Sequence, residues 1–191
     1  MHEKALMRLS VFLWAHSTYG PHKKAMVYWE YMKIHLATDH AGFNMKEHIK
    51  SWLHNDGYDI VDHGAFAFDQ DDDYPDFIAE AARAVQESPE DCALVFGGSG
   101  QGEAMVANRF SGIRATVYYG TAGKQSDADG VALDIIEASK MHNHANVLSL
   151  GARFISNDEA ERVIKQWLGT SFTNEERHVR RIAAIERVSN M

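Results

Sequence analysis

The chain has 191 residues, of which 45% are hydrophobic and 24% charged, so it can bury a core and is not a disordered polymer. Its 27 acidic residues outnumber 19 basic ones, and the net charge of -8 disfavours a general nucleic-acid-binding protein. A single cysteine, Cys92, excludes an intrachain disulfide, and no apolar run approaches the length of a membrane span. We therefore expect a cytoplasmic protein with neither nucleic acid nor membrane among its partners.

Residues 1–31 differ from the rest of the chain. They are rich in His, Tyr, Trp and Met and show no periodic apolar pattern. The apolar stretch from Leu9 to Ala15 resembles part of a signal peptide, but it is short and no small-residue cleavage pattern follows it. We predict an N-terminal extension without a catalytic role over residues 1–31, and one domain over residues 32–191.

From Met32 onward, short apolar runs alternate with segments of helical periodicity. The predicted strands are Ile34–Thr38, Tyr58–Asp62, Cys92–Phe96, Ile113–Tyr118 and Asn146–Leu150. The predicted helices are Phe43–Asn55, Asp76–Glu87, Glu103–Arg109, Val131–Met141, Asp158–Leu168 with Asn157 as N-cap, and Asn174–Val188. The alternation is typical of βαβ units and predicts a parallel sheet with helices on both faces. Such sheets carry their sites at the carboxyl ends of strands, here after Thr38, Phe96 and Leu150.

A glycine cluster from Gly97 to Gly102 follows the third predicted strand and is followed by Glu103. Glu103 breaks both the dinucleotide-binding fingerprint and the phosphate loop of nucleotide hydrolases, and Gln101 breaks the nucleophile elbow. A set of main-chain amides beside a hydroxyl and a carboxylate remains. Amides can stabilise an enediolate and a carboxylate can move its proton, but a plain strand–helix turn explains the loop equally well.

Histidines flank two of the predicted strands. The pair Asp39-His40 follows the first strand and can bind a sugar hydroxyl or a phosphate, although Asp39 is equally suited to cap a helix. The run from His142 to His144 precedes the last strand. Its His-x-His pattern can bind metal, but no clear ligand set accompanies it, so we predict no metal and an acid/base role for His142.

Arginines follow the last predicted strand and occupy the last helix. Arg177 and Arg181 share one helix face, where they can grip a phosphate or form a solvated basic face. Arg153 comes directly after the fifth strand. The acidic run from Asp69 to Asp73 lacks the glycine and the terminal Glu of a calcium loop, and we expect it to be a solvated turn.

Seven short motifs, taken in order, resemble the ribose/galactose isomerase family, which contains ribose-5-phosphate isomerase B and the galactose-6-phosphate isomerase subunits. The motifs are Asp39-His40-Ala41-Gly42, Tyr74-Pro75-Asp76, Gly97-Gly98-Ser99-Gly100-x-Gly102-Glu103, Ala107-Asn108, His142-Asn143-x-Ala145-Asn146-Val147-Leu148, Gly151-Ala152-Arg153 and Arg177-His178-x-x-Arg181. The resemblance implies a three-layer α/β/α, Rossmann-like domain with a five-stranded parallel sheet. It also implies cofactor-free aldose–ketose isomerisation of a phosphorylated sugar by a homodimer or homotetramer, with the C-terminal helix reaching the dimer partner.

The resemblance assigns roles to individual residues. Glu103 would carry the proton between two carbons, and His142 and Asp39 would open the furanose ring. The enediolate would be held by Ser99 and by the loop amides of Gly98, Gly100 and Gly102. The sugar would be contacted by Tyr74 and Asn143, and the phosphate by His40, Arg153, Arg177, His178 and Arg181, some of them from a second chain.

One branch of the family uses a cysteine base at the position of Gly97. Cys92 lies five residues earlier, inside a strand, so this chain resembles the Glu-base branch. An insertion around residues 121–131 and the residue His144 depart from the family pattern. They leave the sugar open between ribose 5-phosphate and a six-carbon phosphate such as allose or galactose 6-phosphate. A noncatalytic sugar-phosphate sensor and a metal-dependent hydrolase are further alternatives.

Overall fold

The computed structural model describes residues 32–121, 123, 125–126, 130 and 132–189. The predicted N-terminal extension over residues 1–31 and much of the insertion around residues 121–131 lie outside this part of the chain. The boundary between an extension and a domain at residue 32 therefore stays a prediction. No helix among the described residues is long and apolar enough to cross a membrane.

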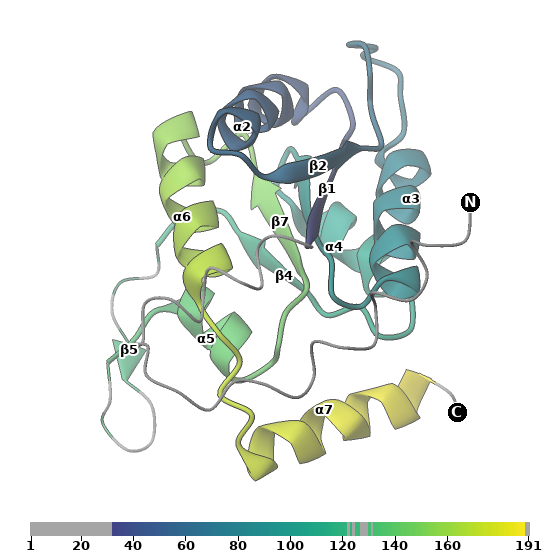
Figure 1. Ribbon diagram of the computed structural model, residues 1–191. Coiled ribbons are helices and arrows are strands. Elements are labelled where there is room, and N and C mark those ends of the chain that lie inside the picture. The colour runs from purple at the N-terminus through teal and green to yellow at the C-terminus, as the bar shows by residue number, and fades with distance from the viewer. Residues whose placement is uncertain (1–31, 122, 124, 127–129, 131, 190–191) are drawn as a thin grey trace, which may run out of the picture. The chain divides into compact units, whose positions relative to one another are not determined.

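Five parallel strands form one sheet in the order β2-β1-β3-β7-β4 (Figure 1). Their bounds are Asp59–Asp62, Lys33–Thr38, Cys92–Gly97, Val147–Gly151 and Ala115–Tyr118, in that order. The central strands β1, β3 and β7 are almost entirely buried, whereas β2 and β4 at the edges are mostly half-buried. Runs that are apolar on both faces indicate a parallel sheet covered on both sides, and the predicted fold class is confirmed.

Helices cover both faces of this sheet (Figure 1). On one face lie α3 (Tyr74–Glu87) and α4 (Gln101–Ala107). They pack over a core rich in small side chains, such as Ala81, Ala93 and Ala107, which let the helices approach the sheet closely. The other face carries α2 (Phe43–Asn55), α5 (Ile135–Met141) and α6 (Asn157–Gly169).

The last helix, α7 (Glu176–Ser189), is attached on the side of the sheet where the parallel strands begin, which we call the amino edge. The segment before it is bound by the Thr173 N–H, which donates to the carbonyl of Met141 at the end of α5 (3.2 Å). Farther along the helix, Glu186 accepts from the Gly112 N–H ahead of β4 (3.0 Å). Both anchors precede a strand of the sheet, so α7 lies away from the carboxyl ends of the strands.

Of the six predicted helix starts, only that of α2 matches the structure; the other five differ by one to four residues, and side-chain caps explain two of these differences. The N-cap of α6 is Ser156, whose hydroxyl accepts from the Glu159 N–H (3.2 Å), while Asn157 is already helical. Helix α5 begins at Ile135 because the carboxylate of Asp134 caps it by accepting from the Ile136 N–H (2.8 Å). The expected first turn from Val131 instead contains the short strand β6 (Ala132–Leu133), which pairs with β5 (Gln125–Ser126).

Candidate active site

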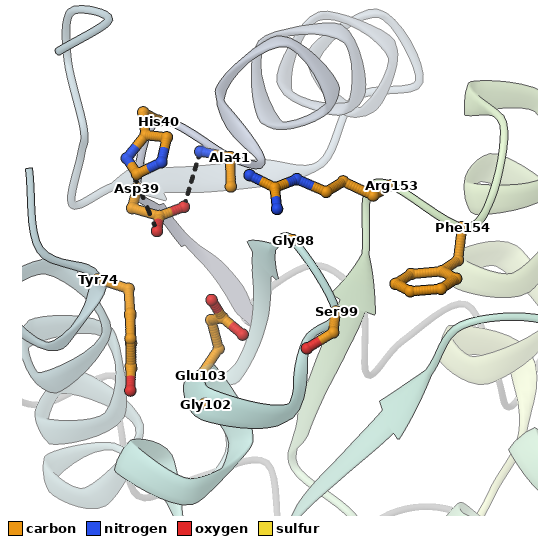
Figure 2. A pocket seen from close by; sticks show the side chains of 10 residues that line it. All are labelled: Asp39, His40, Ala41, Tyr74, Gly98, Ser99, Gly102, Glu103, Arg153 and Phe154. Atoms are coloured by element: carbon orange, nitrogen blue, oxygen red, sulfur yellow. Dashed lines mark hydrogen bonds and ion pairs between the residues drawn. The ribbon is translucent and has the colours of Figure 1, made fainter. Parts of the chain in front are cut away.

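A cavity of about 380 Å³ opens at the carboxyl ends of the central strands. The chain runs from β1 to β2 on one side of β1 and then crosses to β3 on its other side, where β7 and β4 follow in the sheet. The boundary between β1 and β3 is therefore the switch point of the sheet. Ligands of open α/β sheets bind at such a point. The lining residues, shown in Figure 2, are Asp39, His40, Ala41, Tyr74, Gly98, Ser99, Gly102, Glu103, Arg153 and Phe154.

Glu103 supplies a buried carboxylate to this cavity. It lies in the first turn of α4, and only 4% of the residue is exposed. Loss of hydration raises the pKa of the Glu103 carboxyl; its own main-chain N–H opposes this shift, and the charge of Asp39 adds to it. A carboxylate with a raised pKa is a stronger base, as expected for proton abstraction from carbon.

The glycine loop lets this carboxylate lie against the backbone. A Cβ atom at Gly97 would come within 1.8 Å of Glu103 Oε1, so only glycine fits beneath the side chain. Gly100 has a φ of 77°, a left-handed conformation that glycine adopts without strain, and its carbonyl accepts from Ser149 Oγ (2.6 Å). The glycines therefore serve the approach of Glu103 and a turn, and the sequence alone did not distinguish these uses.

Three other side chains face the same space from separate elements. Figure 2 shows Glu103 between Tyr74, at the start of α3, and Ser99 in the glycine loop. Arg153 follows β7, and its main-chain N–H donates to the carbonyl of Gly98 (3.1 Å), which fixes the two loops together. The guanidinium of Arg153 is exposed and forms no ion pair with any carboxylate of the described residues. It is available to an anionic ligand.

Asp39 and His40 enter the cavity just after β1. Asp39 is buried, and its Oδ1 accepts from the Ala41 N–H (2.9 Å), a local turn that directs the carboxylate inward. The ring Nδ1 and the main-chain N–H of His40 both contact Asp72 Oδ1 at 2.8 Å. This contact raises the pKa of His40 against the opposing loss of hydration, and Asp39 raises it further.

The prediction of a solvated turn over Asp69–Asp73 is wrong for Asp72. Its side chain is only 10% exposed, because it folds under His40 from a loop 32 residues farther along the chain. Sequence reasoning missed it, since an acidic run next to a helix start is usually solvated. Phe154, which lines the cavity, was also missed. It directly follows Arg153, and its ring lies 6.3 Å from that of Tyr119.

The remaining predicted residues do not line this cavity. His142 is the C-cap of α5, and its ring centroid lies 4.5 Å from that of His178, a buried residue of α7. Thr173 Oγ1 donates to Met141 O (2.9 Å) and therefore accepts from His178 Nδ1 (3.0 Å). The other three members of this group are exposed: Asn143, Arg177 and Arg181.

The cavity residues and the group around His142 lie at opposite ends of the strands. The cavity is at the carboxyl edge, where the strands end, and His142 and α7 are at the amino edge, where they begin. Asn143 precedes β7 and Arg153 follows it, and a parallel strand of five residues spans about 16 Å. That is farther than a single pentose phosphate reaches. The structure thus brings together Glu103, Asp39 and their neighbours, and it keeps His142 and α7 apart from them within one chain.

Only one group of three potential metal ligands lies close together among the described residues, namely Asp39, His40 and Asp72, with donor atoms within 4.8 Å of one another. Hydrogen bonding accounts for their positions, since Asp72 bonds to the His40 ring and Asp39 to a main-chain N–H. His144, the other half of the His-x-His pattern, stacks on Phe172 at a centroid distance of 4.7 Å. Neither histidine of that pattern belongs to a set of metal donors within the described ranges.

Cys92 takes no part in the site. It lies at the start of β3 and is buried, and burial raises the pKa of its thiol to about 12. A thiol in that state is protonated and a poor nucleophile. The prediction that Cys92 is not the base agrees with this environment.

An α/β sheet with a buried carboxylate and a glycine loop at its switch point defines a class of site suited to proton transfer on a small anionic ligand. The family model described as Ribose/Galactose Isomerase matches residues 34–185. Ribose-5-phosphate isomerase B of Mycolicibacterium paratuberculosis is 32% identical over 151 residues, which are 79% of this chain and 87% of the relative. The corresponding Escherichia coli protein is 31% identical over 82% of this chain and 95% of its own.

Solved structures agree with these sequence matches. Ribose-5-phosphate isomerase B of Clostridium thermocellum superposes with a TM-score of 0.73 at 33% identity, over 83% of this chain and 98% of that one. The Mycoplasma genitalium enzyme, solved with bound ribulose 5-phosphate, gives a TM-score of 0.72 at 30% identity, over 84% of this chain and 97% of its own. The chain therefore belongs to the ribose/galactose isomerase family.

Proposed function

We propose that this chain interconverts ribose 5-phosphate and ribulose 5-phosphate through an enediolate, with Glu103 as the base. The observation that carries the proposal is the buried Glu103 carboxylate, which lies against Gly97 at the switch-point cavity. The relatives and solved structures reported above are named ribose-5-phosphate isomerase B, and none of these names favours a six-carbon substrate or a sensor.

The cavity supplies groups for each part of the reaction. Glu103 takes the proton from carbon 2 of the open aldose and returns it to carbon 1, while a proton moves between the two oxygens. Ser99 and the amides of the glycine loop, from Gly98 to Gly102, stabilise the negative charge that develops on the enediolate. Tyr74 contacts the sugar from the opposite wall, and His40 and Arg153 bind the phosphate.

A complete site needs two chains. His142, for ring opening with Asp39, and Asn143, for the sugar, lie at the amino-terminal edge of the sheet, opposite the cavity. A homodimer is the smallest assembly in which residues of one chain can reach the cavity of another. In it, α7 of one protomer brings its phosphate ligands to the cavity of its partner. These ligands are Arg177, His178 and Arg181. A homotetramer would be a dimer of such dimers.

The isomerase proposal extends to the domain boundary and to the cellular location of the protein. Residues 32–191 make up the isomerase domain, and residues 1–31 are an extension without a catalytic role. The family match begins at residue 34, which supports this division. We place the reaction in the cytoplasm, where the single thiol of Cys92 stays reduced.

The test is incubation of metal-free, full-length protein with ribose 5-phosphate in deuterated water. We expect ketose formation, with solvent deuterium at carbon 1 of the ketose whenever the proton on Glu103 exchanges before its return. Equal rates with and without a strong chelator are expected, because the proposed steps use side chains and amides alone. No conversion of ribose 5-phosphate, with conversion of allose or galactose 6-phosphate, would replace the ribose assignment by a six-carbon one.

A further inference from the structure

The carboxylate of Asp72 makes a paired contact with His40. One oxygen, Oδ1, lies 2.8 Å from the main-chain N of His40 and 2.8 Å from its ring Nδ1. The two donors hold both the backbone and the ring, so the imidazole has one orientation at the wall of the cavity. The loop that carries Asp72 thus reaches the site without lining it.

The second oxygen of Asp72 indicates that this contact serves more than packing. Oδ2 is buried and has no hydrogen-bond partner among the described residues, and the side chain is 90% buried (10% exposed). A buried carboxylate with half of its capacity unused is unfavourable unless a positive charge lies beside it. An asparagine would accept the same two hydrogen bonds at a smaller desolvation penalty. The negative charge of Asp72 is therefore matched to a cationic His40.

We propose that Asp72 is a positioning residue of this site, which locks the proton of His40 on Nδ1 and so reserves Nε2 for the phosphate of the substrate. The proposal rests on the isomerase function proposed above, because that function supplies the phosphate. The acidic loop ahead of Tyr74 would then orient the ring of His40, a role that neither the glycine loop nor α7 has.

The proton inventory of the ring makes the role specific. A carboxylate accepts only, so His40 Nδ1 must carry a proton whenever the contact with Asp72 is made. A neutral His40 then has a bare Nε2, which repels a phosphate oxygen, and only the cation donates from Nε2. Asp72 and Asp39 raise the pKa of His40 and favour this cation. The other charged side chains that face the same cavity are Glu103 and Arg153.

The experiment compares full-length wild type with Asp72→Asn, using NMR titration of the histidine ring signals in the absence of substrate. The signal of His40 is identified by its loss in His40→Gln. We expect the pKa of His40 to fall in Asp72→Asn, because the variant lacks the carboxylate charge that favours the cation. The matched control is Asp71→Asn, which removes the same charge from an exposed position of the same loop and leaves the pKa of His40 unchanged.

A second measurement needs no variant. In wild type above the pKa of His40, the ring ¹⁵N shifts report which nitrogen keeps the proton. We expect the Nδ1–H form, because Asp72 accepts from that nitrogen. A proton on Nε2, or equal pKa values of His40 in wild type and Asp72→Asn, would overturn the proposal.

Kinetics then connect the ring to the substrate. KM for ribose 5-phosphate should rise as pH increases through the pKa of His40, with little change in kcat, because the bare Nε2 no longer donates. In Asp72→Asn this rise should begin at a lower pH than in wild type, so at a pH between the two pKa values of His40 the variant has the higher KM. A wild type that isomerises no sugar phosphate but shows the Nδ1–H form and the expected pKa change would refute the proposed function, while Asp72 would still be shown to position His40.

Discussion

The two edges of the sheet present their functional groups in opposite ways. At the carboxyl edge, Glu103 and Asp39 are buried around a cavity, and their neighbours hold them by hydrogen bonds and close contacts. At the amino edge, Asn143, Arg177 and Arg181 are exposed, although His178 beside them is buried. The proposed base at the carboxyl edge is thus preorganised, whereas most of the proposed ligands at the amino edge are open to solvent.

This difference indicates that the carboxyl edge is suited to the chemical step and the amino edge to substrate binding. Charge development is stabilised best by groups that are already oriented and shielded from water, which describes the carboxyl edge. Long arginine side chains on an exposed helix can adapt to a phosphate presented by another protomer. The predictions below test this division of labour between the two edges, from the largest expected effect to the smallest.

Glu103→Gln should lower kcat by about 10²- to 10⁴-fold, because it removes the proton carrier and preserves the shape of the side chain. Steady-state assays with ribose 5-phosphate measure the loss, and calorimetry measures binding, which we expect to be retained. Turnover of Glu103→Gln close to that of wild type would contradict the assignment of the base to the carboxyl edge.

Mixing two inactive variants should restore activity if the edges of two chains meet. In a hybrid dimer of Glu103→Gln with His142→Asn, one of the two sites combines the intact Glu103 with the intact His142. Random exchange makes half of the dimers hybrids, so the mixture should regain about a quarter of the wild-type activity.

The control for this mixture is each variant refolded alone, which should stay inactive. If both groups acted within one chain, every site in the hybrid would carry a defect. An absence of recovery in a mixture proven to contain hybrids would therefore refute the two-chain site.

Gly97→Ala should reduce kcat by about 10- to 100-fold, since misplacing a catalytic group by about an ångström has effects of this order. The added Cβ would lie 1.8 Å from Glu103 Oε1, so the carboxylate must move. Gly169→Ala at the end of α6 is the matched control, because its Cβ meets no atom within 4 Å. Thermal unfolding of both variants separates a displaced carboxylate from a damaged fold.

Arg177→Ala should raise KM about tenfold with kcat nearly unchanged, as expected for loss of one charge-assisted hydrogen bond to the phosphate. The side chain is exposed, and its Nε pairs with Glu175 (2.8 Å), so little stability is at stake. Arg180→Ala on the same helix is the control and should leave KM as it is. A large fall in kcat for Arg177→Ala would move the amino edge from binding into the chemistry.

Much of the fold followed from local pattern. The run from Cys92 to Phe96 is apolar at every position, and such a run bounded by turns predicts a strand covered on both faces. Helix α2 begins and ends where its periodicity indicates. The starts of α5 and α6 did not follow in this way. Ser156 and Asn157 are both good N-caps for α6, and the prediction took Asn157; for α5 it took no account of Asp134.

The site was predictable in its motifs but not in its arrangement. Sequence reasoning placed Glu103 beside a set of amides, and the structure adds that Gly97 makes room for it and that burial raises its pKa. Asp72 escaped notice because its partner, His40, lies 32 residues away and nothing in an acidic run indicates which carboxylate turns inward.

The sequence by itself determined the order of strands and helices, because apolar periodicity records local conformation. Its seven ordered motifs indicated the family and, through that resemblance, the candidate base. Only the tertiary structure decided that His142 and α7 lie at the edge opposite Glu103, and that Asp72 is buried beneath His40. The physical reason is that a sequence motif specifies only the local conformation of the chain around it. The distance between two motifs depends on the strand that separates them and on how its neighbours pack.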